Sequence, residues 1–121
     1  MIKNLSEGKC EACRIDAPLL SESEIEELLP NISSWSIIDD EGVKRLMCSF
    51  AFIDYEQSVE FTNKIAQLAE EEDHHPEIIL EWGKVTVFWW SHKIQGLHMN
   101  DFVCAAKTDK LFNTKSVSYT H

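Results

Sequence analysis

Residues 70–92 read EEEDHHPEIILEWGKVTVFWWSH, and this stretch decides the fold of the chain. A proline disfavours helix in the residue before it, so Pro76 predicts that the preceding helix ends just ahead of it. Runs 78–82 and 84–91 are rich in β-branched and aromatic residues and flank Gly83, which is typical of a β-hairpin. The second run is apolar on both faces. We therefore expect helices to cover one face and a subunit or a ligand to cover the other.

The residues before this stretch predict a long helix that begins after Asp54, a favoured N-cap residue. Apolar and small side chains recur beyond it at helical spacing and would form a buried stripe: Val59, Phe61, Thr62, Ile65, Leu68 and Ala69. Farther upstream, runs 35–38 and 43–50 flank an acidic turn that ends in Gly42. This pattern predicts a first hairpin.

The two ends of the chain complete the expected order of elements. A capping box of Ser21 and Glu24 begins a short helix over about 22–29, and Pro30 ends it. A last helix is expected over 101–111. The order helix–strand–strand–helix–strand–strand–helix predicts an α+β fold, in which helices pack on one face of a four-stranded antiparallel sheet.

Length and charge set the expected class of protein. A chain of 121 residues fits one domain, with 1–20 as an extended arm, 21–113 as the domain and 114–121 as a frayed tail. Its 21 acidic and 11 basic side chains give a net charge of -10, which disfavours binding to nucleic acid or anionic membranes. With neither a membrane span nor a signal peptide apparent, we expect a cytoplasmic protein with reduced cysteines.

Three of the five histidines fall where predicted elements end, and such positions present side chains to binding sites. His74 and His75 follow the long helix, and His92 follows the last strand. Glu70 precedes His74 by four residues, so on a helix the two would share a face and could hydrogen-bond. Imidazole titrates at about 6.5 and suits proton transfer near neutral pH. The alternative is that His74 and His75 only end a helix, with solvated rings.

The wider spacing resembles the signature of the pterin-4a-carbinolamine dehydratases. Glu70, the His74-His75-Pro76 triplet, Trp82, His92 and Asp101 follow one another at separations that this family permits. Further similarity, to bacterial members in particular, lies in Lys9–Arg14, Trp35, Asn100–Phe102 and Ala105–Lys107.

This resemblance implies a hydro-lyase that dehydrates 4a-hydroxytetrahydrobiopterin to quinonoid dihydropterin. The family thereby recycles the cofactor of aromatic amino-acid hydroxylases, which suggests a functional link to a phenylalanine hydroxylase. The resemblance also implies no metal, no bound cofactor and a homodimer or tetramer. Carried over by position, the catalytic residues would be His74, His75 and His92, and the substrate-binding residues Glu70, Pro76, Ser91, Lys93, Trp35 and Asp101. Trp82 would be an apolar wall or support.

The chemistry of this reaction suits a pair of imidazoles. Loss of hydroxide from C4a needs a proton donor, and N5 must give up its proton to a base or to water. Our hypothesis is that His74 and His92 transfer the protons, while His75 binds and orients the substrate.

Two features depart from this simple interpretation. Cys10 and Cys13 have the spacing of half a zinc site or of a redox pair, although no second pair follows, and Cys48 and Cys104 are expected to be buried. His98 stands where many relatives carry Thr or Ser as a helix cap. The last helix would then begin from Asn100 or lose a cap worth roughly 1 kcal/mol, unless the ring reaches the active site.

Two other functions remain as alternatives. Some animal relatives act as dimerisation cofactors of a homeodomain transcription factor, and this role would use the outer helix and the sheet edges. A role in molybdenum-cofactor metabolism would keep the site and change the ligand.

Overall fold

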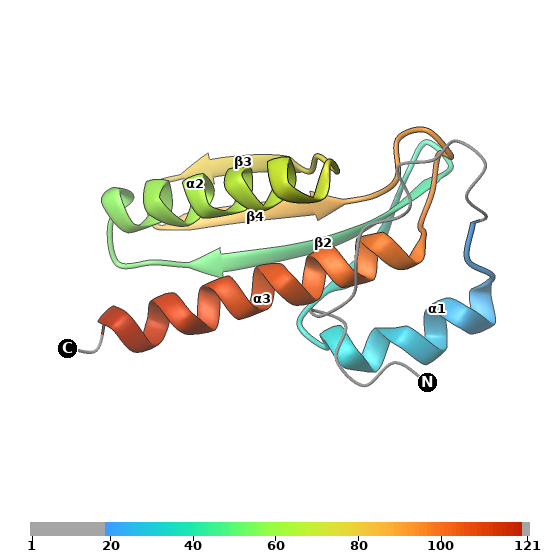
Figure 1. Ribbon diagram of the computed structural model, residues 1–121, viewed down its shortest axis with the longest axis horizontal. Coiled ribbons are helices and arrows are strands. Elements are labelled where there is room, and N and C mark those ends of the chain that lie inside the picture. The colour runs from blue at the N-terminus through green and yellow to red at the C-terminus, as the bar shows by residue number, and fades with distance from the viewer. Residues whose placement is uncertain (1–18, 120–121) are drawn as a thin grey trace.

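The structure, a computed structural model, describes residues 19–119, with side chains described as far as Asn113. The elements are α1 (Glu22–Leu28), the 3-10 helix η2 (Leu29–Ile32), β1 (Ser36–Asp40), β2 (Val43–Ala51), α2 (Tyr55–Glu72), β3 (Glu77–Glu81), β4 (Lys84–Trp89) and α3 (Met99–Tyr119). The strands form one antiparallel sheet in the order β1-β2-β4-β3. Figure 1 shows α2 and α3 on the same side of this sheet. The predicted fold class and element order are confirmed.

The helix starts follow from the capping residues. The Ser21 hydroxyl accepts from the backbone N–H of Glu24 at 3.2 Å, and the Glu24 carboxylate accepts from the Ser21 N–H at 2.8 Å, which confirms the capping box. The Asp54 carboxylate accepts from the N–H of Gln57 at 2.9 Å. The α-helix α1 ends at Leu28, ahead of Pro30 as predicted, and the chain continues into η2, because proline is tolerated in the first turn of a helix.

The core lies between the sheet and the two long helices. Alternate residues of the central strands face the helices, because successive side chains of a strand point to opposite sides. Among the buried residues of this layer are Leu46, Cys48 and Phe50 of β2, Val85, Val87 and Trp89 of β4, Phe61 and Ile65 of α2, and Phe102 and Cys104 of α3. Burying each large side chain contributes about 1.5–3 kcal/mol, so this layer fixes the helices against the sheet.

The opposite face of the sheet carries Met47, Ile79 and Phe88, and the register pairs Met47 with Phe88 and Ile79 with Thr86. None of the helices described within 19–119 packs on this face. The second cover expected from the apolar pattern of β4, a subunit or a ligand, stays a prediction.

The last helix is longer than expected at both ends. It begins at Met99, two residues before the predicted start, and continues to Tyr119. His98 caps it: the ring Nδ1 accepts from the N–H of Asn100 at 3.3 Å, and the carboxylate of Asp101 accepts from the N–H of His98 at 2.9 Å. A histidine ring thus takes the place of a capping hydroxyl, so the helix neither starts from Asn100 nor loses its cap.

Some expectations fall outside the described residues. These are the extended arm, of which residues 1–18 are not described, and the Cys10–Cys13 pair within it. The boundaries of the domain and the frayed tail stay predictions. Within the part of the chain that is described, no helix is both long and apolar enough to span a membrane.

Candidate active site

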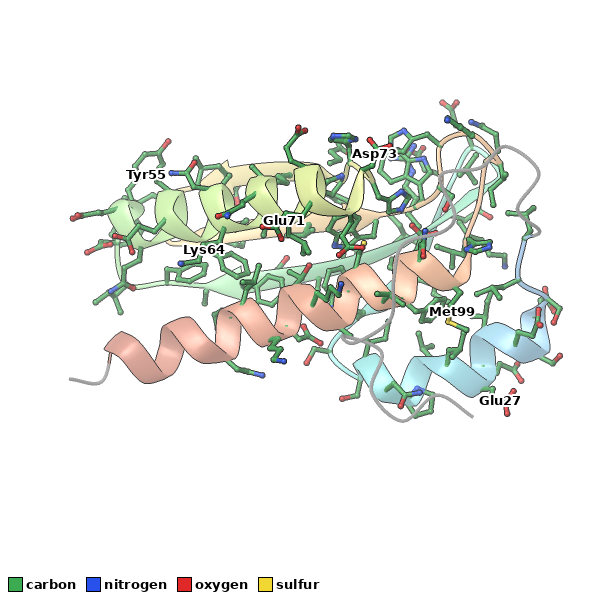
Figure 2. The ribbon with its side chains drawn as sticks, viewed as in Figure 1. Glu27, Tyr55, Lys64, Glu71, Asp73 and Met99 are labelled. Carbon is green, nitrogen blue, oxygen red and sulfur yellow. The ribbon has the colours of Figure 1, made fainter. Side chains whose placement is uncertain are left out.

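Four element ends meet at one end of the sheet. The register pairs Glu77, at the start of β3, with Phe88, near the end of β4, and α2 ends immediately before β3. Asp101 in the first turn of α3 bonds to residues of both neighbouring segments. Figure 2 labels Asp73 at this end of α2 and Tyr55 at the other end. His74, His75 and His92 therefore lie at the same end of the sheet.

A left-handed residue, Asp73, comes directly before the first two histidines. Asp73 has φ 52° and ψ 44°, and the N–H groups of Asp73 and His74 both donate to carbonyl groups of the last turn of α2. Chain direction changes at this cap. As a result the His74 side chain is buried, with 6% exposed, whereas the His75 side chain is 58% exposed.

This cap overturns the expected pairing of Glu70. A bond from Glu70 to His74 assumed that the helix includes residue 74, but α2 ends at Glu72. The Glu70 carboxylate instead accepts from Nε2 of His75 at 2.9 Å. Both side chains are largely exposed, so the pair orients the ring and adds little stability.

Asp101 is the buried partner of His74. Its Oδ1 lies 2.7 Å from Nε2 of His74, and its Oδ2 accepts from the Ser91 hydroxyl and the His98 N–H, each at 2.9 Å. The Asp101 side chain is 0% exposed. A buried carboxylate needs several donors, and these three fix its position and hence the orientation of the His74 ring.

Trp89 supports the His74 ring from the core. The two rings stack with centroids 5.6 Å apart and an interplanar angle of 13°. The indole of Trp89 is itself fixed, because its Nε1 donates to Thr108 of α3 at 3.0 Å. The His74 ring is therefore held by two contacts: the bond to Asp101 at Nε2 and the stack on Trp89 against its face.

His92 lies on a tight loop after β4. Two backbone hydrogen bonds between Ser91 and Gly96 close this loop, and the Gln95 amide donates to the His92 carbonyl at 2.8 Å. The Nε2 of His92 donates to the backbone carbonyl of His75 at 2.9 Å. This contact places the exposed His92 ring beside the His74-His75 segment.

The three rings share one feature. Each is held at Nε2 by an oxygen acceptor: Asp101 for His74, Glu70 for His75 and the His75 carbonyl for His92. A carbonyl or an ionised carboxylate only accepts, so in the neutral ring Nε2 carries the proton and Nδ1 is the basic nitrogen.

The other expected site residues lie at different places. Ser91 belongs to the buried network, Pro76 is half-buried beside His75, and Lys93 is exposed on the His92 loop. Two tryptophans are not brought to the histidines. Trp35 is buried in the core and its Nε1 donates to Asp109 at 2.8 Å, eight residues or about 12 Å along α3 from Asp101.

Trp82 lies at the opposite end of the sheet. It occupies the turn between β3 and β4 and is 72% exposed. The six residues of β4 separate this turn from the His92 loop by about 20 Å. Trp82 therefore lies away from His74, His75 and His92, despite its place in the signature.

Sequence reasoning missed the aromatic supports of the site. Trp89 and Trp90 were treated only as apolar strand residues, although Trp90 stacks on His92 with centroids 4.2 Å apart. A signal was available, because Trp90 and His92 are two residues apart and side chains at that spacing share a face of an extended chain. No sequence signal pairs Trp89 with His74.

The acidic run before the histidines is stabilised by partners. Glu72 forms a 2.6 Å ion pair with Lys107 of α3, and Glu71 accepts from Gln67 at 3.3 Å. Lys107 thus offsets part of the unfavourable interaction between carboxylates and the negative helix C-terminus. It also ties the end of α2 to α3, on which Asp101 lies.

The described cysteines are core residues, as predicted. Cys48 and Cys104 are buried, and burial, assisted by nearby Asp109, raises the pKa of the Cys48 thiol to about 12. Such a thiol is unreactive at neutral pH. Within residues 19–119, no three His, Cys, Asp or Glu side chains are grouped in a way that would hold a metal ion.

Comparisons with known proteins agree with one another. A family model described as pterin 4 alpha carbinolamine dehydratase matches residues 18–111. A Photobacterium profundum protein, provisionally named as such a dehydratase, is 57% identical over 109 residues, which cover 90% of this chain and 97% of that protein. A similarly named Nitrosococcus oceani protein is 54% identical over 110 residues, which cover 91% of this chain and 97% of that protein. A Brucella melitensis structure described as a transcriptional coactivator/pterin dehydratase matches with a TM-score of 0.71 at 29% identity, over 78% of this chain and 99% of that chain.

Proposed function

The chain belongs to the pterin-4-alpha-carbinolamine dehydratase family, and we propose that it dehydrates 4a-hydroxytetrahydrobiopterin to quinonoid dihydropterin by histidine acid/base catalysis. The observation that carries the mechanism is the shared anchoring of His74, His75 and His92 at Nε2. Such anchoring puts the proton of each neutral ring on Nε2 and makes Nδ1 its basic nitrogen.

The reaction moves one proton in and one proton out. The C4a–O bond breaks, and the leaving oxygen takes a proton from an imidazolium to depart as water. The N5–H bond gives its proton to a base, and its electron pair forms the C4a=N5 double bond. Each proton transfer by a positioned side chain contributes about 10²–10⁴-fold to the rate.

His74 and His92 fit the two proton-transfer roles. His74 is buried against Asp101, and an ionised carboxylate stabilises the positive charge that an imidazole acquires when it accepts a proton. His92 is exposed, so it can exchange protons with water between turnovers. His75, whose pairing with Glu70 lies at the surface, is assigned to binding and orienting the pterin.

Kinetics on single variants test this division. His74→Ala and His92→Ala should each lower kcat by about 10²–10⁴-fold, whereas His75→Ala should mainly raise KM. His98→Asn is the matched control, since asparagine keeps a cap at that position. A protein that loses all activity only when His75 is replaced would overturn the assignment.

The source of the substrate and the absence of a cofactor are part of the same proposal. We place the protein in the cytoplasm as a homo-oligomer, receiving the carbinolamine from an aromatic amino-acid hydroxylase such as phenylalanine hydroxylase. Because side chains perform every proton transfer, activity should survive treatment with a chelator. Addition of the purified protein should speed the decay of the carbinolamine that a hydroxylase releases, and no acceleration would contradict the link.

A further inference from the structure

The ring of His92 rests on an aromatic neighbour that the mechanism above does not use. The Trp90 indole and the His92 imidazole stack with centroids 4.2 Å apart at an interplanar angle of 27°. The hydrogen bond from Nε2 to the His75 carbonyl fixes one atom of the ring. A bond at one atom leaves the ring plane able to turn about it, so the stack supplies the second constraint.

Trp90 is in turn held by Arg45. The guanidinium carbon of Arg45 lies 3.8 Å from the centre of a Trp90 ring, within the range of a cation–π contact. Arg45 also forms ion pairs with Asp40 at 3.0 Å and with Glu77 at 3.4 Å. This Arg45–Trp90 stack therefore connects β1, β2 and β3 with the residue that follows β4.

The placement of the stack distinguishes it from core packing. Trp90 and Arg45 are only partly buried, whereas the neighbouring Trp89 and Leu46 are fully buried among the helices. The guanidinium is oriented by carboxylates from two strands, which gives the planar group a fixed position. The sheet thus holds Trp90 and Arg45 in place, and the His92 ring on the following loop keeps its orientation by packing against them.

We infer that Trp90 and Arg45 are positioning residues for His92, which aim its Nδ1 at the substrate. This inference rests on the proposed function, because it assumes that His92 transfers a proton. Productive proton transfer tolerates displacements of only about 0.5 Å, so loss of the Arg45–Trp90 stack should slow chemistry more than binding.

The kinetic test compares two exposed or half-exposed tryptophans. Trp90→Ala should lower kcat about tenfold or more with little change in KM, and Trp90→Phe, which keeps a stacking ring, should restore most of it. Trp82→Ala is the matched control at the far end of the sheet and should leave both constants unchanged. A rise in KM at constant kcat would overturn the positioning role and indicate direct substrate contact.

A double variant makes the test specific for His92. In a His92→Ala background, Trp90→Ala should cause no further loss, because the two changes remove the same function. An equal loss in both backgrounds would overturn the inference. Arg45→Lys, which keeps the charge but not the planar group, should lower kcat by a smaller factor than Trp90→Ala, with Lys84→Gln as its control.

Spectroscopy separates this inference from the proposed function. In the ligand-free protein, the Trp90 ring current should shift the His92 ring protons upfield, and Trp90→Leu should abolish this shift while the remaining spectrum stays native. Unchanged His92 resonances would overturn the stack, whatever the enzyme does. Absence of dehydratase activity in the wild type, with the shift present, would instead overturn the proposed function alone.

Discussion

The Nε2 atom of His74 lies 2.7 Å from Oδ1 of Asp101, and both side chains are buried. These residues are 27 positions apart: His74 lies just after the end of α2, and Asp101 lies in the first turn of α3. The contact therefore connects the end of α2 with the start of α3, at the end of the sheet where His74, His75 and His92 lie. It has a structural role and also orients the His74 ring, to which we assign a proton transfer.

Asp101→Asn should therefore reduce both activity and stability. The amide keeps the shape but removes the charge that orients His74, so kcat should fall by about 10²-fold or more. Breaking a buried pair should also lower the free energy of unfolding by about 3–5 kcal/mol. Steady-state kinetics and urea unfolding measure the two effects, and full activity in the variant would contradict the assignment.

Asp109→Asn is the matched change on the same helix, and its effect should be opposite. Asp109 accepts from Trp35, and burial raises the pKa of its carboxyl. A carboxyl with a raised pKa in the fold contributes stability at low pH that is lost as the pH rises through its folded pKa. At neutral pH the uncharged Asn should therefore keep or increase the free energy of unfolding, with unchanged kcat. A loss as large as that of Asp101→Asn would be unexpected.

The tautomers of the histidines give a direct test of the shared anchoring. Nitrogen-15 NMR of the ligand-free protein above neutral pH should show His74, His75 and His92 with the proton on Nε2. His98 should show the same tautomer, because its Nδ1 accepts from the Asn100 N–H. A proton on Nδ1 of His92 would be incompatible with the bond to the His75 carbonyl.

Glu70→Gln should affect substrate binding more than folding. The pair with His75 is exposed, so its loss should change the free energy of unfolding by no more than about 1 kcal/mol. Because the carboxylate orients a binding residue, KM should rise more than kcat falls. Glu71→Gln removes the neighbouring carboxylate, which contacts Gln67, and should change neither constant.

Stability at alkaline pH should depend on Cys48. Its thiol has a pKa of about 12 in the fold, against an ordinary value of 9.0. The sign follows from the raised value: the contribution is complete below pH 9 and is lost as the pH rises toward 12. The free energy of unfolding measured across this range should fall more steeply for the wild type than for Cys48→Ala. Parallel curves would contradict the role of the thiol.

His98 should behave as a cap and not as a catalytic group. His98→Ala removes the acceptor for the Asn100 N–H and should cost about 1 kcal/mol of unfolding free energy, while His98→Asn should cost much less. Both variants should keep their kcat when measured below their melting temperatures. A large loss of kcat in His98→Asn would return this ring to the active site.

Several features were predictable because their signals lie within a few residues. Ser21 with Glu24, and Asp54 before α2, are capping patterns that act over one helical turn. The wrong pairing of Glu70 has an equally local cause, since the left-handed Asp73 ends the helix one residue before His74. Periodicity alone does not reveal such a residue, because asparagine and aspartate tolerate that conformation without a glycine to mark it.

By itself, the sequence determined the element order, the α+β class and the set of histidines, through alternation, caps and spacing. Only the tertiary structure decided that Asp101 holds His74, that Trp35 and Trp82 lie away from the histidines, and that Arg45 supports Trp90 across the sheet. The physical reason is the distance along the chain over which each kind of interaction acts. Strand and helix patterns depend on neighbours along the chain, whereas these contacts depend on the strand register and on the packing of helices against the sheet, which bring distant element ends to one edge.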